Sequence, residues 1–177
     1  MTTISTLVSI AVIAAMVLLW SIKVYSDLVV LSNLKDEAWH GVDAQLRRRF
    51  DLVSSFVKTV ADTRADDVDV RNVEEALSMI QRASTQAARI EAENSLSSSL
   101  RLLLESAKEC SETTTDPNFG RILDKLSFQE NELILARLFY DGMAQDFNDF
   151  VLSFPSSIIS RKLGYRDVPY FEDLRAS

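Results

Sequence analysis

The sequence predicts an all-α protein: an N-terminal transmembrane helix, then an up-and-down bundle of three long helices and a short C-terminal helix. Residues 1–22 contain no charged side chain, and a run of this length is about what a helix needs to cross a bilayer. Downstream, apolar residues recur at three- and four-residue spacing in three long stripes. The 177 residues include only four Gly and three Pro, fewer than strand-rich folds with many tight turns use.

The apolar run is interpreted as a membrane anchor that contacts the lipid bilayer through residues 4–22. Trp20 and Tyr25, near its downstream end, are typical of the headgroup level. A secretory signal peptide is one alternative, but no basic residue precedes the run and no small-residue cleavage pattern follows it. A buried core helix is the other alternative, and it is disfavoured because the run is apolar on all faces.

The distribution of basic residues predicts the orientation of the anchor. Lys23 and Lys35 lie just downstream of the run, whereas no Lys or Arg lies upstream of it. Cytoplasmic flanks carry the excess of positive charge. We therefore expect a single-pass protein of the cell membrane, with its N-terminus outside and its helical bundle, residues 23–163, in the cytoplasm.

The first bundle helix is expected to continue from the anchor, over residues 23–63. Its apolar stripe runs from Leu28 to Val60, and Gly41 lies inside it without ending it, because one Gly costs only about 1 kcal/mol relative to Ala. A flexible linker at residues 21–27 would contradict this continuity. At the far end, an acidic turn leads to Asp67 or Asp69, which are candidate N-caps of the next helix.

The second long helix is predicted over residues 70–110, and the third over residues 118–154. Small polar residues at 92–99, AENSLSSS, interrupt the second stripe; we interpret them as a kink, with a true break as the alternative. Pro117 and Pro155 bound the third stripe. A last helix over residues 156–163 is expected to stop at Gly164, followed by an irregular tail over residues 164–177.

The net charge disfavours some kinds of partner, and the cysteine content bears on the compartment. The formal net charge of −7 disfavours nucleic acid as a partner, since phosphate binding needs an excess of Lys and Arg on one face. The same charge disfavours broad contact between the bundle and anionic lipid. Cys110 is the single cysteine and cannot form an intramolecular disulfide, which fits a reducing compartment.

Several stretches resemble the LemA family in order and spacing. They include the pattern V-x-L-x-N-x-x-x-E-A-W at Val29 to Trp39 and, further on, VDAQLRRRFDL (42–52), AENSLSSSLRLLL (92–104), NFGRILDKLSFQENELILARLFYD (118–141), FNDFVLSFP (147–155) and GYRDVPYFE (164–172). Two departures are Ser54-Ser55, where the family usually has Pro-Asn, and Asp141, which is often Asn. The resemblance covers nearly the whole chain.

The resemblance to LemA proteins implies a fold more than a reaction. It implies an N-terminal membrane helix with a helical bundle, no established enzymatic activity and no cofactor. One relative is associated with the building of magnetosome membranes, and some members are encoded near membrane metalloproteases. The resemblance therefore suggests protein partners in the membrane without identifying them.

Catalytic and metal-binding residues are not expected. Glu37 and His40 form an E-x-x-H pattern of the kind found in di-iron bundles, but His40 is the only histidine, so the second motif that such a site needs is missing. Cys110 lies beside Glu109 and Glu112, without a cationic neighbour in sequence to activate the thiol. The sequence contains no phosphate-binding glycine loop and no zinc-ligand spacing.

A structural polar layer at mid-bundle is predicted instead. Counting levels by helix rise in an up-down-up bundle brings charged residues of all three long helices to the same height. Arg48, Arg49 and Arg137 are expected to pair with some of Asp43, Glu93 and Glu130, while Asn94 and Asn131 complete the hydrogen bonds. Buried pairs of this kind fix register more than they add stability. The alternative is that most of these side chains form a solvated face.

The leading functional hypothesis is a non-enzymatic, membrane-anchored scaffold or protein-interaction module. An accessory regulator of a membrane-embedded protease is the main alternative. A ligand-binding bundle with a pocket lined by Trp39, Tyr140 and Phe147 is a third hypothesis. A homo-oligomer stays open as well, since small residues such as Ser5 and Ser9 in the anchor are weak dimer signals.

Overall fold

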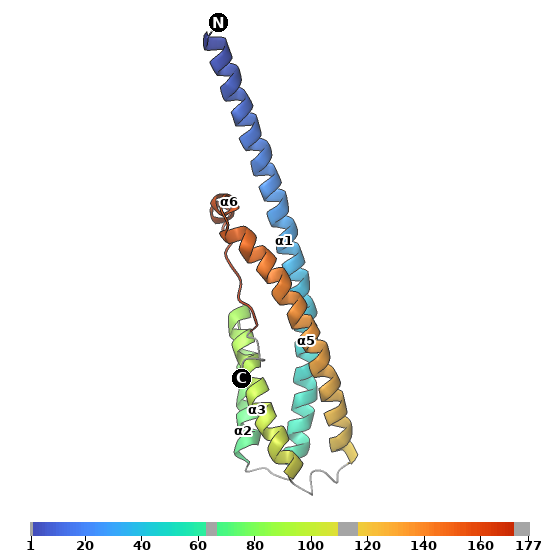
Figure 1. Ribbon diagram of the computed structural model, residues 1–177. Coiled ribbons are helices and arrows are strands. Elements are labelled where there is room, and N and C mark those ends of the chain that lie inside the picture. The colour runs from blue at the N-terminus through green and yellow to red at the C-terminus, as the bar shows by residue number, and fades with distance from the viewer. Residues whose placement is uncertain (1, 63–66, 110–116, 172–177) are drawn as a thin grey trace. The chain divides into compact units, whose positions relative to one another are not determined.

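The computed structural model describes residues 2–62, 67–109 and 117–171, and the regular structure within them is helical (Figure 1). The helices are α1 (Thr2–Ala61), α2 (Val68–Arg82), α3 (Gln86–Glu109), α5 (Pro117–Leu152) and α6 (Ser156–Lys162). The predicted all-α class is therefore confirmed. The expectations for Cys110, for the turns at 63–66 and 110–116 and for the tail at 172–177 lie outside the described residues.

Helix α1 continues from the apolar N-terminal run without a break. Residues 21–27 are helical, and so is Gly41, so the continuity expected between anchor and bundle arm is confirmed. By length and composition, α1 is the one helix among the described residues that is able to cross a membrane. The residues of its apolar window are almost all exposed.

The middle of the chain differs from the prediction, because residues 70–110 form two helices. Helix α2 ends at Arg82, and Ala83 adopts an extended conformation. Helix α3 then begins at Gln86, where the Thr85 hydroxyl accepts a hydrogen bond from the Ala88 N–H at 3.2 Å. This is an N-cap formed without Gly or Pro. At the start of α2, Asp67 is the N-cap, as one of the two candidates predicted, and accepts from the Asp69 N–H at 2.8 Å.

Residues 92–99, where a kink was predicted with a true break as the alternative, lie inside the continuous helix α3, so the break does not occur there. The hydroxyl groups of this stretch bond back to the helix that carries them. Ser97 donates to the Glu93 carbonyl at 2.9 Å, and Ser98 donates to the Asn94 carbonyl at 3.2 Å. Such bonds to the carbonyl four residues earlier satisfy small polar side chains within a continuous helix.

The chain divides into two compact units, of which the larger comprises residues 40–139 and 169–177. Its core is formed by the second half of α1, by α2 and α3, and by the first half of α5, with Phe56, Val73, Leu96 and Leu126 among the buried residues. Helices α2 and α3 pack together as an antiparallel hairpin (Figure 1). We call this unit the charged-core unit, for the side chains described below.

Within the charged-core unit, α5 runs antiparallel to α1, which corrects the predicted up-down-up order. Phe56 packs near Phe119, with ring centroids 5.7 Å apart, and Gln129 donates to the Gln45 side chain at 2.8 Å. Later residues of α1 thus meet earlier residues of α5. The extra reversal between α2 and α3 is the physical reason, since it adds one more change of chain direction before α5.

The second unit comprises residues 1–39 and 140–168. Leu28, Phe147 and Val151 are buried together in it, and the Asn148 side chain holds the Val168 backbone by two hydrogen bonds, at 2.8 and 2.9 Å. Gly164 has φ +82°, a left-handed conformation that ends α6 as the sequence predicted.

Gly164 and Gly142 provide a matched pair for testing this unit. Gly164→Ala is expected to lower the free energy of unfolding by about 1–2 kcal/mol, because an L side chain is strained at positive φ. Gly142→Ala is expected to raise it by about 0.5–1 kcal/mol, because Gly142 is helical and an added Cβ meets no atom within 4 Å. Thermal unfolding of the full chain in detergent measures both. Equal effects of the two substitutions would contradict the assigned conformations.

Candidate functional site

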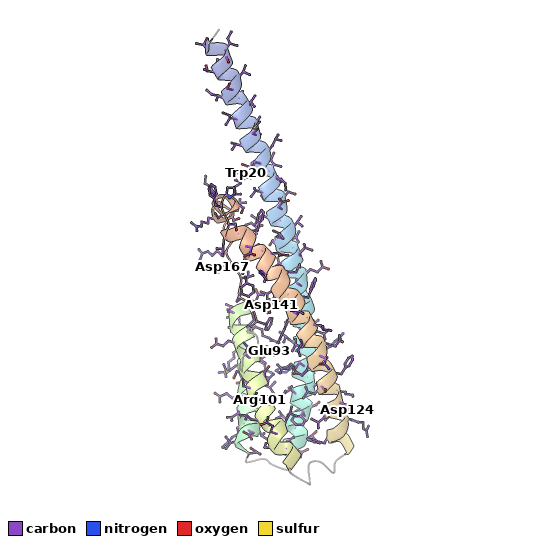
Figure 2. The ribbon with its side chains drawn as sticks, viewed as in Figure 1. Trp20, Glu93, Arg101, Asp124, Asp141 and Asp167 are labelled. Carbon is purple, nitrogen blue, oxygen red and sulfur yellow. The ribbon has the colours of Figure 1, made fainter. Side chains whose placement is uncertain are left out.

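The most unusual feature of the charged-core unit is an arginine at a core position of α1. Val42, Leu46 and Val53 are buried on the stripe that α1 turns toward the other helices. Arg49 falls on the same stripe, three residues after Leu46 and four before Val53, so the helix directs its side chain into the core. Only 1% of Arg49 is exposed, and Glu93 of α3, which is labelled in Figure 2, is 0% exposed.

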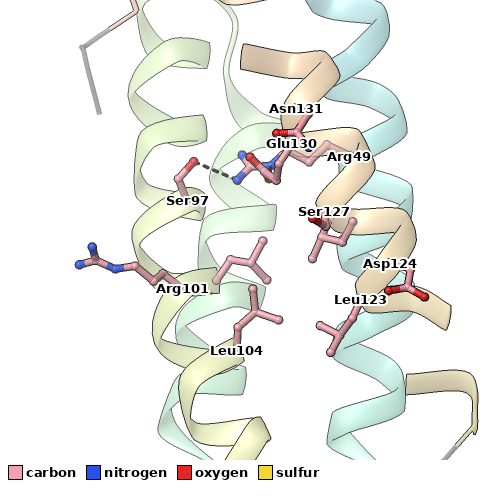
Figure 3. Close-up of a pocket in the computed structure, with 11 residues that line it drawn as sticks. Arg49, Ser97, Arg101, Leu104, Leu123, Asp124, Ser127, Glu130 and Asn131 are labelled. Atoms are coloured by element: carbon pink, nitrogen blue, oxygen red, sulfur yellow. Dashed lines mark hydrogen bonds and ion pairs between the residues drawn. The ribbon is translucent and has the colours of Figure 1, made fainter. Parts of the chain in front are cut away.

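The guanidinium group of Arg49 donates to side chains of two other helices. Its Nη1 lies 3.1 Å from Glu93 Oε2 and its Nη2 lies 2.9 Å from the Ser97 hydroxyl, both on α3. Its Nε lies 2.5 Å from Glu130 Oε1 on α5. Figure 3 shows Arg49 reaching between these helices, with Ser97 on one side and Glu130 beside it. One side chain thus connects α1, α3 and α5.

Two further arginines surround Glu93. Arg89 Nε lies 3.2 Å from Glu93 Oε1, one turn earlier on α3; the two atoms form an ion pair but are not aligned as a hydrogen bond. Arg137 of α5 is buried, acts electrostatically on Glu93, and has its guanidinium carbon 4.7 Å from the centre of the Phe171 ring. We call Arg49, Arg89, Glu93, Ser97, Glu130 and Arg137 the Arg49 cluster.

Burial determines the protonation behaviour of Glu93. Desolvation raises the pKa of this carboxyl above its ordinary value of 4.5, and it outweighs the opposing attraction of Arg49, Arg89 and Arg137. The charged form of Glu93 is therefore costly in this core even with three arginines close to it. The cluster fits a role in specifying how the helices align better than a role as a source of net stability.

The structure places the eight residues of the predicted polar layer in different surroundings. Arg49, Glu93 and Glu130 lie together, and Arg137 is buried beside them. Asn94 is half-buried, and its side-chain oxygen has no hydrogen-bond partner among the described residues. The other three, Asp43, Arg48 and Asn131, lie outside the cluster.

Helix periodicity explains why these three lie outside. Arg48 precedes Arg49 by one residue, about 100° around α1, and is exposed. Asp43 pairs with Arg47 of its own helix at 2.7 Å, and Asn131 is exposed on α5. Sequence reasoning missed Arg89 and Ser97, although both lie four residues from Glu93, the spacing at which side chains of one helix meet.

A cavity of about 510 Å³ opens beside the cluster, between α3 and α5 (Figure 3). Leu100, Leu104 and Leu123 form apolar walls, and Arg49 and Glu130 lie at its polar side. The three guanidinium nitrogens of Arg49 already bond to Glu93, Ser97 and Glu130. The cavity can hold a compact apolar group between its leucine walls, with the ion pair of Arg49 and Glu130 at its polar side.

The other candidate residues from the sequence lie apart from the cluster. Glu37 and His40 are exposed on α1. Among residues 2–62, 67–109 and 117–171, no group of three His, Cys, Asp or Glu side chains is placed to hold a metal ion. Trp39 packs edge-on against the buried Tyr140, with ring centroids 5.4 Å apart, and Phe147 packs in the same way near Tyr165. Each of the three rings thus packs against one aromatic partner, in the pairs Trp39–Tyr140 and Phe147–Tyr165.

Comparison with known families identifies the chain. A family model described as LemA family matches residues 38–177, which include every member of the Arg49 cluster. The chain belongs to the LemA family. The resemblance drawn from the sequence motifs is thereby confirmed, and a search of curated proteins found no match. In this LemA chain, the motif stretches at 42–52, 92–104 and 118–141 supply all of the cluster except Arg89.

Arg49 and its neighbour Arg48 test the structural importance of the cluster. Arg49→Met removes the cation that contacts Glu93 and Glu130, and it should lower the free energy of unfolding by about 3 kcal/mol or more, since buried charge is left uncompensated. Arg48→Met, at an exposed position, should change it by less than about 0.5 kcal/mol. Chemical unfolding of the full chain measures both, and equal losses would show that the cluster has no special role.

The raised pKa of Glu93 predicts a pH dependence of stability. Below pH 4.5 the carboxyl is protonated in both the folded and unfolded states; above it the unfolded state loses the proton first. The contribution of Glu93 to stability is therefore greatest in acid and is lost as pH rises through the folded pKa. The difference in unfolding free energy between the wild type and Glu93→Gln should fall over this window. Glu91→Gln, an exposed change on α3, is the matched control.

Proposed function

We propose that this LemA protein is a non-enzymatic scaffold, tethered to the cell membrane by one pass of α1, with its N-terminus outside and its helical units in the cytoplasm. The observation that carries the proposal is the contrast along α1. The first part of the helix exposes large apolar side chains on every face, whereas its later part has one buried stripe around a buried arginine. The first pattern suits lipid, and the second suits a folded bundle.

The exposed apolar side chains support the tether. The large apolar side chains that are more than half exposed include Ile4, Leu7, Ile10, Ile13, Met16 and Leu19. At about 100° per residue, these positions cover the whole circumference of the helix. In water this surface is unfavourable, at about 25 cal/mol per Å² of apolar area. In a bilayer it becomes favourable. Lys23 and Lys35, downstream of the run, support the proposed orientation, because cytoplasmic flanks are enriched in basic residues.

The Arg49 cluster supports a scaffold over an enzyme. Arg49 bonds to Glu93 and Glu130, and Arg49 and Glu93 are almost completely shielded from solvent. A catalytic group has to reach its substrate, whereas a buried ion network can hold helices in one register. We therefore assign the cluster to shaping the bundle, and we assign function to the surfaces that the bundle presents to other proteins.

Membrane fractionation tests the tether. The full chain should remain in the membrane pellet after alkaline carbonate washing. Ile10→Arg with Ile13→Arg should shift it toward the soluble fraction, because each Arg at the centre of a span costs about 2.5–3.5 kcal/mol. Ile10→Leu with Ile13→Leu is the matched control and should stay in the pellet. A soluble wild-type chain would overturn the tether.

Orientation and partners need separate measurements. With Cys110→Ser as background, Thr3→Cys should react with an impermeant thiol reagent in intact cells, and Lys58→Cys only after lysis; the reverse would contradict the orientation.

Cross-linking and mass spectrometry in native membranes should then recover protein partners. Recovery of a membrane-embedded protease, with altered proteolysis on deletion, would favour the accessory-regulator alternative. Recovery of uncross-linked monomers alone would contradict the scaffold.

A further inference from the structure

Helix α5 exposes large apolar side chains on the outer side of the charged-core unit. Phe128 is 67% exposed, Leu135 is 63% exposed and Leu138 is 70% exposed. Ile134 and Phe139 beside them are also exposed. The described exposed positions of α1 in the same unit differ in kind, for they include Arg47, Arg48, Asp51, Ser55 and Lys58. A solvated helix face normally resembles the face of α1, so the outer face of α5 marks an interaction surface.

The spacing of these residues is that of a coiled-coil seam. Phe128, Asn131, Leu135 and Leu138 follow one another at intervals of three, four and three residues, which is the a and d spacing of a heptad. We call these four residues the α5 seam. All four are exposed, and Asn131 also borders the cavity between α3 and α5 (Figure 3). A surface of this form fits another α-helix.

We propose that the α5 seam packs in parallel and in register against the α5 seam of a second copy of this chain. In that register each apolar residue of the seam meets its own counterpart. Asn131 also meets Asn131 of the second copy, and two side-chain amides are mutually complementary because each has both donors and an acceptor. In any other register the Asn131 amide would face an apolar side chain and lose hydrogen bonds on burial, so Asn131 favours the register in which it meets its counterpart.

The residues beside the seam favour the parallel arrangement. In parallel packing, Ser127 lies across from Glu132 of the second copy, and Ile134 lies across from Phe139, so no like charges meet. In the antiparallel register that aligns Phe128 with Leu138, the two Glu132 carboxylates come to the same level on the same flank. Like charges at such positions repel.

The α5 seam fits a lipid surface less well than it fits a second copy of the chain. Helices that lie in the membrane interface carry Lys and Arg on their polar face. The described exposed residues around the seam include Asp124 as well as Lys125, and Glu132 is half-exposed there. With a net charge of −7 for the chain, these residues give no excess of positive charge to attract anionic lipid.

The seam is short, so its pairing depends on the tether. It extends from Phe128 to Leu138, fewer than two heptads, and helical segments of this length associate only marginally in water. Anchoring two copies in one bilayer raises their effective concentration by orders of magnitude without any new contact. Copies inserted with the same orientation are related by rotation about the membrane normal, which suits parallel pairing. The inference thus rests on the proposed membrane tether.

Cysteine cross-linking of the full chain in native membranes tests the pairing. In a Cys110→Ser background, Asn131→Cys should form a disulfide-linked dimer under copper phenanthroline, about tenfold more than Ser98→Cys, an exposed control on α3. Cross-linking of Asn131→Cys no greater than that of Ser98→Cys would overturn the proposal. So would cross-linking of Asn131→Cys only to a different protein.

A second pair of variants keeps the test independent of folding. Leu135→Glu, added to the Asn131→Cys chain, should abolish most of the dimer, while Leu102→Glu, at an exposed leucine of α3, should leave it unchanged. Both leucines are exposed, so thermal unfolding should be similar for the two. Membrane fractionation of the same samples distinguishes a failure of the seam pairing from a failure of the membrane tether. If Asn131→Cys is found in the membrane fraction but does not form the dimer, the seam pairing is contradicted and the tether is not.

Discussion

The charged-core unit depends on the buried guanidinium group of Arg49. A charge without solvent requires partners in fixed positions, and Arg49 has them on two other helices: Glu93 and Ser97 on α3, and Glu130 on α5. Sliding α3 or α5 by one turn along α1 would separate these groups by about 5 Å and leave charges buried without partners. The apolar contacts around Leu96 and Leu126 tolerate such a shift far better, because dispersion and apolar burial are not directional. The cluster therefore selects one alignment of the helices.

The charged-core unit differs from an ordinary soluble bundle in where its charged and apolar side chains lie. It places Arg49, Glu93 and Arg137 inside and leaves Phe128 and Leu135 on the outer face of α5. The first arrangement specifies shape at a cost in desolvation, and the second leaves apolar area available for association. Both suit the proposed role of presenting a defined helical surface at a membrane. The proposed tether in α1 and the proposed pairing of the α5 seam complement each other, since confinement in a bilayer would strengthen a contact too small to persist in water.

Much of the fold could be predicted from the sequence, and the errors have local causes. The apolar run and the α1 stripe are strong signals, and Gly164 correctly marked the end of α6. The break at residues 83–85 was missed because Thr85 caps α3 without a glycine or proline. The small polar residues of AENSLSSS do not end α3, because Ser97 and Ser98 bond to carbonyls of the same helix. The missed reversal also inverted the predicted direction of α5. Arg49, Glu93 and Glu130 nevertheless meet, because each lies in the middle part of its predicted segment (23–63, 70–110 or 118–154), and the level of such a residue changes little when the direction of the helix is reversed. The choice between Arg48 and Arg49 was available from the stripe, whereas the roles of Arg89 and Ser97 depended on the orientation of α3.

A double-mutant cycle between Arg49 and Glu93 tests the central claim most directly. The unfolding free energies of the wild type, Arg49→Met, Glu93→Gln and the double variant would be measured at neutral pH in detergent. If the two side chains act as one unit, the losses should fail to add, with a coupling of about 1–3 kcal/mol. The same cycle between Arg49 and the exposed Glu91 should be additive. Additivity between Arg49 and Glu93, within about 0.5 kcal/mol, would contradict the claim that this contact fixes the alignment of the helices.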